Sequence, residues 1–263
     1  MKKNKIIILL VVIIIYGVSL CVVLIRNKDS LEKNDKNNEN KYVVIDNFAR
    51  LSFSNNSWNN ASISEIEDYG KYDVFINNKL LGSFKLEYGT TWNLFNDAND
   101  YTDYEGNLFA YSDNFNINMV KFEKSTFLSD ENKKIITEYF NYDDYSSLIT
   151  SDVITTDIDN NGVMDEVVCV SNIGIDKRYS SKYYNLIFIR LNDEIIEVLN
   201  QNSSNSKIME EPVYNLSTVF VLNGNEYLAI KKTIGIDSDS PTESLILYQN
   251  VNSDNFKKVK LGG

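Results

Sequence analysis

The chain has 263 residues, 43% of them hydrophobic, so it is long and apolar enough to form a substantial core. It contains no histidine, which excludes Ser-His-Asp and Cys-His catalysis and zinc sites of the HExxH type. Its net charge is −11, and all of its acidic residues follow one N-terminal hydrophobic run, so we expect an acidic exported surface and no nucleic-acid partner.

The hydrophobic run covers residues 6–25 and contains no charged residue. As a helix it would span roughly 30 Å, the thickness of the hydrocarbon core of a bilayer. Lys2, Lys3 and Lys5 precede it, and the positive-inside rule keeps such an end in the cytoplasm. We therefore predict a single-pass membrane protein with a cytoplasmic tail at 1–5, a transmembrane anchor at 6–25 and an extracytoplasmic remainder.

Two alternatives for this segment are a cleaved signal peptide and a lipoprotein signal. A cleaved signal has a shorter apolar core and a small-residue exit site, which is missing here. Val18 to Cys21 resembles a lipoprotein box but has Leu20 where a small residue belongs, and more apolar residues follow the cysteine. The length of the run favours an uncleaved anchor, and the polar segment 26–41 after it is predicted to be a flexible tether.

Residues 42–150 are predicted to form an N-terminal β-rich region, because short apolar runs alternate with Asn, Gly and Asp. The predicted strands lie at 72–76, 80–88, 108–111 and 117–122. The first two flank Asn77-Asn78-Lys79 and are expected to form a hairpin. Apolar spacing over 132–140 predicts a helix capped by Ser129 or Asp130, and a second short helix is expected at 62–69.

Residues 151–263 are predicted to contain two sets of four consecutive strands. The first set lies at 153–156, 166–170, 184–190 and 195–199, and the second lies at 216–222, 227–231, 244–248 and 256–259. Ile173-Gly174-Ile175-Asp176 recurs 61 positions later as Ile234-Gly235-Ile236-Asp237, which favours a repeat over coincidental turn punctuation. Each unit would be an antiparallel four-stranded sheet resembling one propeller blade.

The expected fold is therefore mainly β with one or two short helices, in which blade-like repeats form the C-terminal half after a single N-terminal transmembrane helix. Only two blades are visible, and a propeller usually closes with at least about four. Residues 42–150 either contain diverged further blades or form a separate region. Cys169 lies in an apolar strand pattern and is expected to be a buried structural thiol.

One motif carries chemistry, the D-x-D-x-N-G-x-x-D pattern between the first two strands of the first set. Alternating residues of a tight loop turn their oxygens toward one centre, as calcium requires. The predicted calcium ligands are the side chains of Asp157, Asp159, Asn161 and Asp165 and the backbone carbonyl of Val163. An Asx-rich turn without a metal is the alternative.

This site is not an EF-hand, because Val168 stands where a bidentate Glu is needed and strands flank the loop. The stretch TTDIDNNGVMDEVVCVSN at 155–172 resembles the FG-GAP/VCBS repeats of integrin-like β-propellers. That resemblance implies a structural ion that pins the loop and its blade. It also implies a binding or scaffold role in the envelope, with an unspecified ligand.

Two functions are therefore compared. The first is a non-enzymatic, membrane-anchored extracytoplasmic module that binds a protein or glycan of the cell envelope. The alternative is an exported hydrolase that uses paired carboxylates on cell-wall glycan, since a chain without histidine would depend on Asp and Glu. The sequence contains many carboxylates but no distinctive catalytic pair, and this favours the binding module.

Overall fold

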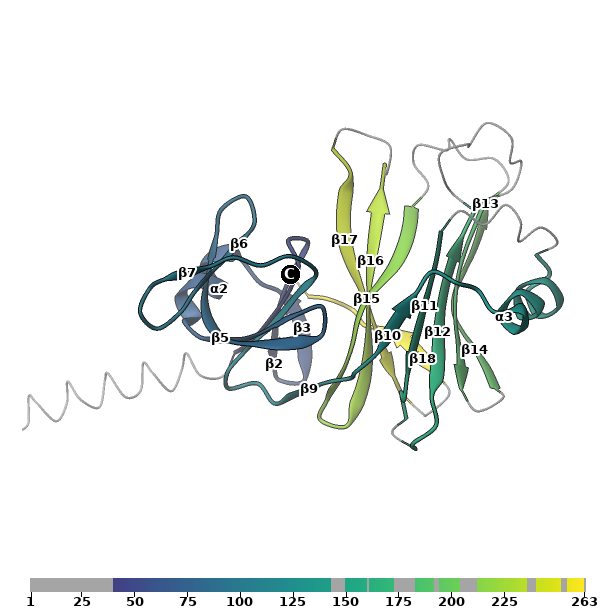
Figure 1. The fold of residues 1–263 in the computed structure, drawn as a ribbon, viewed down its shortest axis with the longest axis horizontal. Helices are drawn as coiled ribbons and strands as arrows, with labels where there is room; N and C mark the ends of the chain where they lie inside the picture. Colours follow the sequence, from purple (N-terminus) through teal and green to yellow (C-terminus); the bar gives the residue numbers. More distant parts are fainter. Residues whose placement is uncertain are drawn as a thin grey trace, which may run out of the picture. The chain divides into compact units, whose positions relative to one another are not determined.

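The computed structural model describes residues 40–142, 150–159, 161–172, 183–191, 194–203, 212–235, 240–251 and 255–262. Tyr42–Gly263 form one compact unit. The fold is mainly β, and its antiparallel sheets do not close on themselves (Figure 1). The predicted anchor and most of the tether lie outside the described residues. Within the described part, no helix is long and apolar enough to cross a membrane.

The N-terminal half of the unit forms one eight-stranded sheet. Its strands, in spatial order, are β3 (Ser57–Asn60), β2 (Ala49–Ser54), β1 (Lys41–Ile45), β8 (Leu108–Ser112), β4 (Tyr72–Ile76), β5 (Lys79–Tyr88), β6 (Trp92–Phe95) and β7 (Tyr101–Thr102). The predicted β4–β5 hairpin is confirmed. Its turn is Asn77-Asn78, and both residues have positive φ, as a two-residue turn of type I′ requires.

Both predicted helices are present, and serine caps begin them. Ser62 caps α2 (Ile63–Tyr69) in a reciprocal capping box with Glu65. Ser129 caps α3 (Asp130–Lys134), whose last turn widens into the π-helical segment η1 (Ile135–Tyr139). The sequence signals of cap and apolar spacing were therefore sufficient to locate both helices.

The C-terminal half forms two five-stranded sheets. The first has the order β10 (Glu123–Ser125), β11 (Thr150–Thr156), β12 (Asp165–Ser171), β13 (Tyr183–Leu191) and β14 (Glu194–Ser203). The second has the order β18 (Phe256–Lys258), β17 (Thr242–Asn250), β16 (Asn225–Ile234), β15 (Pro212–Leu222) and β9 (Ile117–Met119). All eight predicted strands of this half are present in consecutive antiparallel order.

We expected four strands in each sheet, but each of the two sheets has five. The predicted strand at 117–122 is present only as the shorter β9, which pairs with β15, and the additional strand β10, which begins at Glu123 and pairs with β11, was not predicted. Each short strand thus covers an edge of a four-stranded meander that would otherwise present unpaired backbone groups. The recurring Ile173–Asp176 motif lies outside the described residues, as do Ile236 and Asp237 of its second copy.

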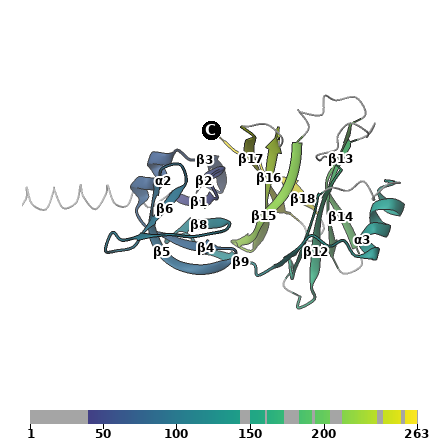
Figure 2. The same ribbon diagram turned by 45° about the horizontal axis from the view of Figure 1, so that its top comes forward.

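The sheets and helices stack in layers because nearly every C-terminal strand is apolar on both faces. Val167 and Cys169 of β12 face a core shared with the second five-stranded sheet, whereas Val168 and Val170 face the α3–η1 helix. The opposite side of the second sheet packs on the eight-stranded sheet, and α2 covers the far side of that sheet (Figure 2). Cys169 is 2% exposed, which confirms its predicted burial, and burial raises the pKa of its thiol to about 12.

Candidate metal centre

The predicted calcium loop connects β11 to β12, which are antiparallel neighbours. Thr156 and Asp165 face each other across the ladder where the two strands meet the loop. Between them Ile158 is 2% exposed and inserts into the core shared by the two five-stranded sheets. The loop is therefore held at both ends by the sheet and in its first half by a buried side chain.

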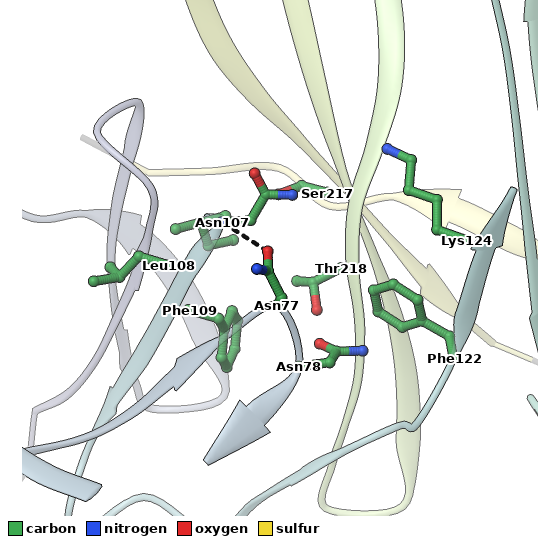
Figure 3. A pocket seen from close by; sticks show the side chains of 10 residues that line it. Asn77, Asn78, Asn107, Leu108, Phe109, Phe122, Lys124, Ser217 and Thr218 are labelled. Carbon is green, nitrogen blue, oxygen red and sulfur yellow. Dashed lines mark hydrogen bonds between the residues drawn. The ribbon is translucent and has the colours of Figure 1, made fainter. Parts of the chain in front are cut away.

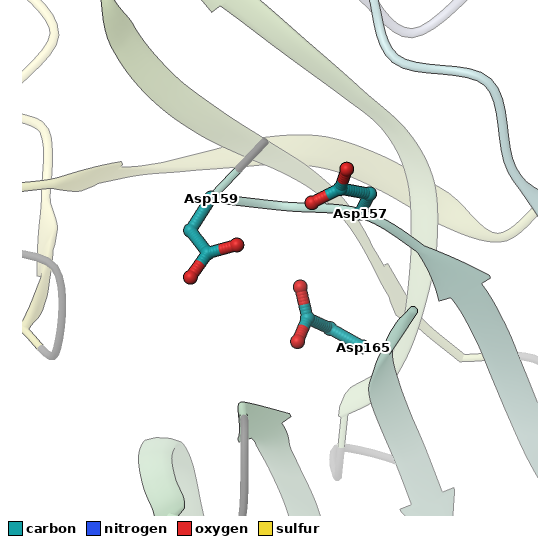
Figure 4. Close-up of side chains that lie close together, drawn as sticks. All are labelled: Asp157, Asp159 and Asp165. Atoms are coloured by element: carbon teal, nitrogen blue, oxygen red, sulfur yellow. The ribbon is translucent and has the colours of Figure 1, made fainter. Parts of the chain in front are cut away.

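Three of the five predicted ligands converge. The carboxylates of Asp157, Asp159 and Asp165 each offer an oxygen within 4.8 Å of the others, and Figure 4 shows them directed toward a common space. Two of the carboxylates are partly exposed and the third is buried. At such separations like charges repel strongly unless a cation lies between them.

Backbone N–H groups of the same loop hold the first two carboxylates. Asp157 accepts hydrogen bonds from the N–H of Asn161 at 3.0 Å and of Gly162 at 2.9 Å. Gly162 has φ +87°, and a Cβ there would meet no atom within 4 Å, so glycine is needed for its backbone angle and not for space. A carboxylate has about four lone-pair sites, so these bonds leave acceptor capacity for an ion.

Asp165 is the unusual member of the group. It is 1% exposed; one oxygen accepts a hydrogen bond from the N–H of Ile158 at 2.8 Å. Its other oxygen, Oδ1, is buried and has no hydrogen-bond partner among the described residues. Burial raises the pKa of this carboxyl, and the negative charges of Asp159 and Asp157 raise it further. A buried carboxylate oxygen without a partner among the described residues, beside two other carboxylates, is the arrangement that a cation site requires.

The two remaining predicted ligands, Asn161 and Val163, belong to the same loop but are not among the converging groups. The side-chain oxygen of Asn161 accepts a hydrogen bond from the N–H of Val163 at 2.7 Å, and its amide nitrogen donates to Asp159 at 2.8 Å. The amide oxygen of Asn161 is therefore engaged with the backbone. Val163 is 52% exposed, and its backbone N–H donates the hydrogen bond to the side-chain oxygen of Asn161.

A further carboxylate, Glu226, is within electrostatic range of the loop but is not among the three carboxylates that converge. Glu226 at the start of β16 has a raised pKa, chiefly because of burial and also because of the charges of Asp159 and Asp165. Its carboxylate accepts a hydrogen bond from the side-chain amide of Asn250. Glu226 follows the Asn223-Gly224 turn, and its spacing in the sequence gives no reason to place it near the loop.

The corresponding connection in the second five-stranded sheet is much shorter. Asn223-Gly224 joins β15 to β16 with positive φ at both residues, so two residues stand where the first sheet has an eight-residue loop. Such a turn brings a single side-chain oxygen, that of Asn223, whereas calcium takes about six to eight oxygens.

No protein-family model matches the chain, and no curated protein or solved structure matches it.

Proposed function

We propose that this protein is a membrane-anchored, extracytoplasmic binding module of the cell envelope, with a structural calcium ion held by the Asp157–Asp165 loop. The observation that carries the calcium proposal is the buried, unpartnered Oδ1 of Asp165 beside two convergent carboxylates. Calcium takes roughly six to eight oxygen ligands in a flexible geometry, which suits a loop rich in carboxylates.

The residues present fit such an ion. Asp157, Asp159 and Asp165 would bind it directly, and the side-chain oxygen of Asn161 and the carbonyl of Val163 would join after a local adjustment. That adjustment exchanges the hydrogen bond between Asn161 and the N–H of Val163 for a bond to the metal. The ion's role would be to neutralise the carboxylates and tie the end of β11 to the start of β12.

The two five-stranded sheets are proposed to be blade-like repeats. Each has an antiparallel meander of four strands, and in each a short strand from the chain before it pairs with the first strand of the meander. The strand-loop-strand setting of the acidic motif agrees with the local resemblance to FG-GAP/VCBS repeats. Only the first copy would retain a metal, because the second has a two-residue turn at that position.

We propose the membrane anchor and the extracytoplasmic location on the basis of the hydrophobic run and the basic residues within 1–25. Binding is preferred over hydrolysis because one pocket of the described residues is lined by amides, hydroxyls, apolar side chains and Lys124, with no carboxylate in its lining. Two acidic groups facing each other across that pocket would have favoured the glycan hydrolase.

Topology and metal binding are tested together by proteolysis. A protease added to intact cells should remove the part of the chain after residue 41, and calcium should slow cleavage within 157–164 relative to chelator. Met164 is 57% exposed and gives the protease access to this loop. Complete protection on intact cells would contradict the topology. Cleavage of the loop at the same rate with and without calcium would contradict the metal site.

A further inference from the structure

A pocket lies away from the metal loop, where the eight-stranded sheet meets β15 (Figure 3). Its volume is about 200 Å³. At about 30 Å³ per liquid water it would hold roughly seven waters or one small ring compound, and it is smaller than the ~300–1,000 Å³ of sites for drug-sized ligands. Its polar wall includes Asn77, Asn107, Ser217 and Thr218, and its apolar wall includes Phe109 and Phe122.

Two polar side chains of this wall are free to bind a ligand. Within the described part of the chain, the side chains of Asn107 and Ser217 make no hydrogen bond, whereas the Thr218 hydroxyl also has no partner but is fully buried. Asn77 is different, because its side-chain oxygen accepts from the N–H of Asn107 at 3.0 Å and fixes the loop that carries Asn107. The pocket therefore has a rigid rim and unused hydrogen-bonding capacity.

A β-bulge in β15 creates this arrangement. Tyr214 and Leu216 face the core between the two five-stranded sheets, whereas Phe220 and Leu222 face the eight-stranded sheet. All four residues have even numbers and would lie on one face of a regular strand. They lie on different faces because the β15–β16 register shifts between Leu216 and Thr218, which leaves Ser217 as the extra residue. Bulges re-aim side chains in this way beside functional sites.

The single charge in the lining of the pocket is neutralised by a neighbouring carboxylate. Lys124 is its one charged lining residue, and its ammonium forms an ion pair with Asp152 at 3.0 Å. The chain carries a net charge of −11, which further disfavours an anionic ligand. The absence of a carboxylate from the lining gives a cation no partner there. An uncharged ligand is the chemistry that remains.

We infer that this pocket binds one uncharged sugar unit of a glycan. A sugar hydroxyl both donates and accepts hydrogen bonds, as do the asparagine amide and serine hydroxyl of the wall. The partly exposed ring of Phe122 offers apolar surface for the C–H groups of a sugar ring, whereas Phe109 is 4% exposed and adds little to it. This inference rests on the proposed function as an envelope-binding module and specifies its ligand class as glycan.

The test is saturation-transfer NMR and titration on the full chain, kept in a detergent without a sugar headgroup. The probes are glucose, galactose and N-acetylglucosamine, with glucuronate as the ring-matched anion. We expect saturable millimolar binding of at least one neutral sugar and weaker binding of glucuronate than of glucose. Asn107→Ala and Ser217→Ala should each weaken binding roughly 2- to 10-fold, the effect of one hydrogen bond.

Asn118→Ala is the matched control, because Asn118 is exposed on β9 and does not line the pocket. It should leave sugar binding unchanged. Absence of saturable binding of all three neutral sugars, stronger binding of glucuronate than of glucose, or equal binding by the pocket variants and wild type would each overturn the inference. The calcium response of the same samples separates the two proposals: a retained response with no sugar binding removes only the sugar site.

Discussion

The carboxylate of Asp165 reaches back across the β11–β12 loop and accepts a hydrogen bond from the backbone N–H of Ile158 at 2.8 Å. Ile158 is itself buried in the core between the two five-stranded sheets, so one contact links the acidic cluster to the packing of the fold. The second oxygen of the same carboxylate has no partner among the described residues. Loss or gain of charge at this position should therefore affect stability as well as metal binding.

Asp165→Asn should have opposite effects with and without calcium. In chelator the amide removes a buried charge that faces two other carboxylates, so the thermal midpoint should stay equal or rise. In calcium the variant should lose most of the midpoint rise, because a charged ligand is missing. Melting curves in both buffers check this, and a variant that is destabilised in chelator and still responds fully to calcium would contradict the assigned role.

The two positive-φ glycines of the strand connections form a matched pair. Gly162→Ala and Gly224→Ala should each lower the free energy of unfolding by about 1 kcal/mol in chelator, because φ is +87° and +77° and neither Cβ meets a neighbour. Only Gly162→Ala should also reduce the calcium-dependent rise in the midpoint. Equal calcium responses in both variants would show that the conformation of the Asp157–Asp165 loop does not matter for the metal.

Substitution of two buried threonines by valine should change the free energy of unfolding in opposite directions. Thr218→Val removes a hydroxyl that has no partner among the residues the structure describes and should raise the free energy of unfolding by about 1 kcal/mol. Thr156→Val removes a hydroxyl that donates to the Lys121 carbonyl at 2.9 Å and should lower it by a similar amount, about 1 kcal/mol. Denaturant unfolding in chelator measures both. Destabilisation by Thr218→Val would indicate that its hydroxyl is already satisfied in the native protein.

In chelator, stability should increase on mild acidification. Burial raises the pKa of Asp46, Asp165 and Glu226 in the folded state, so each folded carboxyl binds a proton more readily than the unfolded one. The stability penalty is therefore present at neutral pH and disappears as the pH falls through the raised values toward 3.8 for the aspartates. Calcium should reverse this trend near Asp165, because protons compete with the metal. Melting curves from pH 7 to about pH 4.5 test the direction.

The sequence predicted most elements of the fold because their signals are local. The Asn77-Asn78 turn, the Ser62 and Ser129 caps and the apolar strands of the C-terminal half are each specified by a few neighbouring residues. The edge strand β10 was missed because Glu123–Ser125 is polar and exposed, so its pairing with β11 depends on backbone hydrogen bonds that no side-chain pattern reports.

The candidate site was predictable only within the loop. Spacing of Asp157, Asp159 and Asp165 indicated a common centre, and the structure brings their oxygens together. The approach of Glu226 was not predictable, because β12 and β16 belong to different sheets and their packing is set by the whole core. The pocket at Ser217 was also not predictable, because a one-residue shift of register does not change the residue pattern of the strand.

The most direct test of the structural calcium site is the thermal midpoint of the full chain in about 10 mM calcium and in chelator, with Asp157→Ala beside it. For sites with Kd of ~0.1–1 mM, binding should stabilise the fold by roughly 1.5–2.5 kcal/mol, or about 3–10 °C in a domain of this size. The account predicts such a rise for wild type and its loss in the variant. An identical midpoint in both buffers for wild type would contradict it and leave the loop as an acidic turn without a metal.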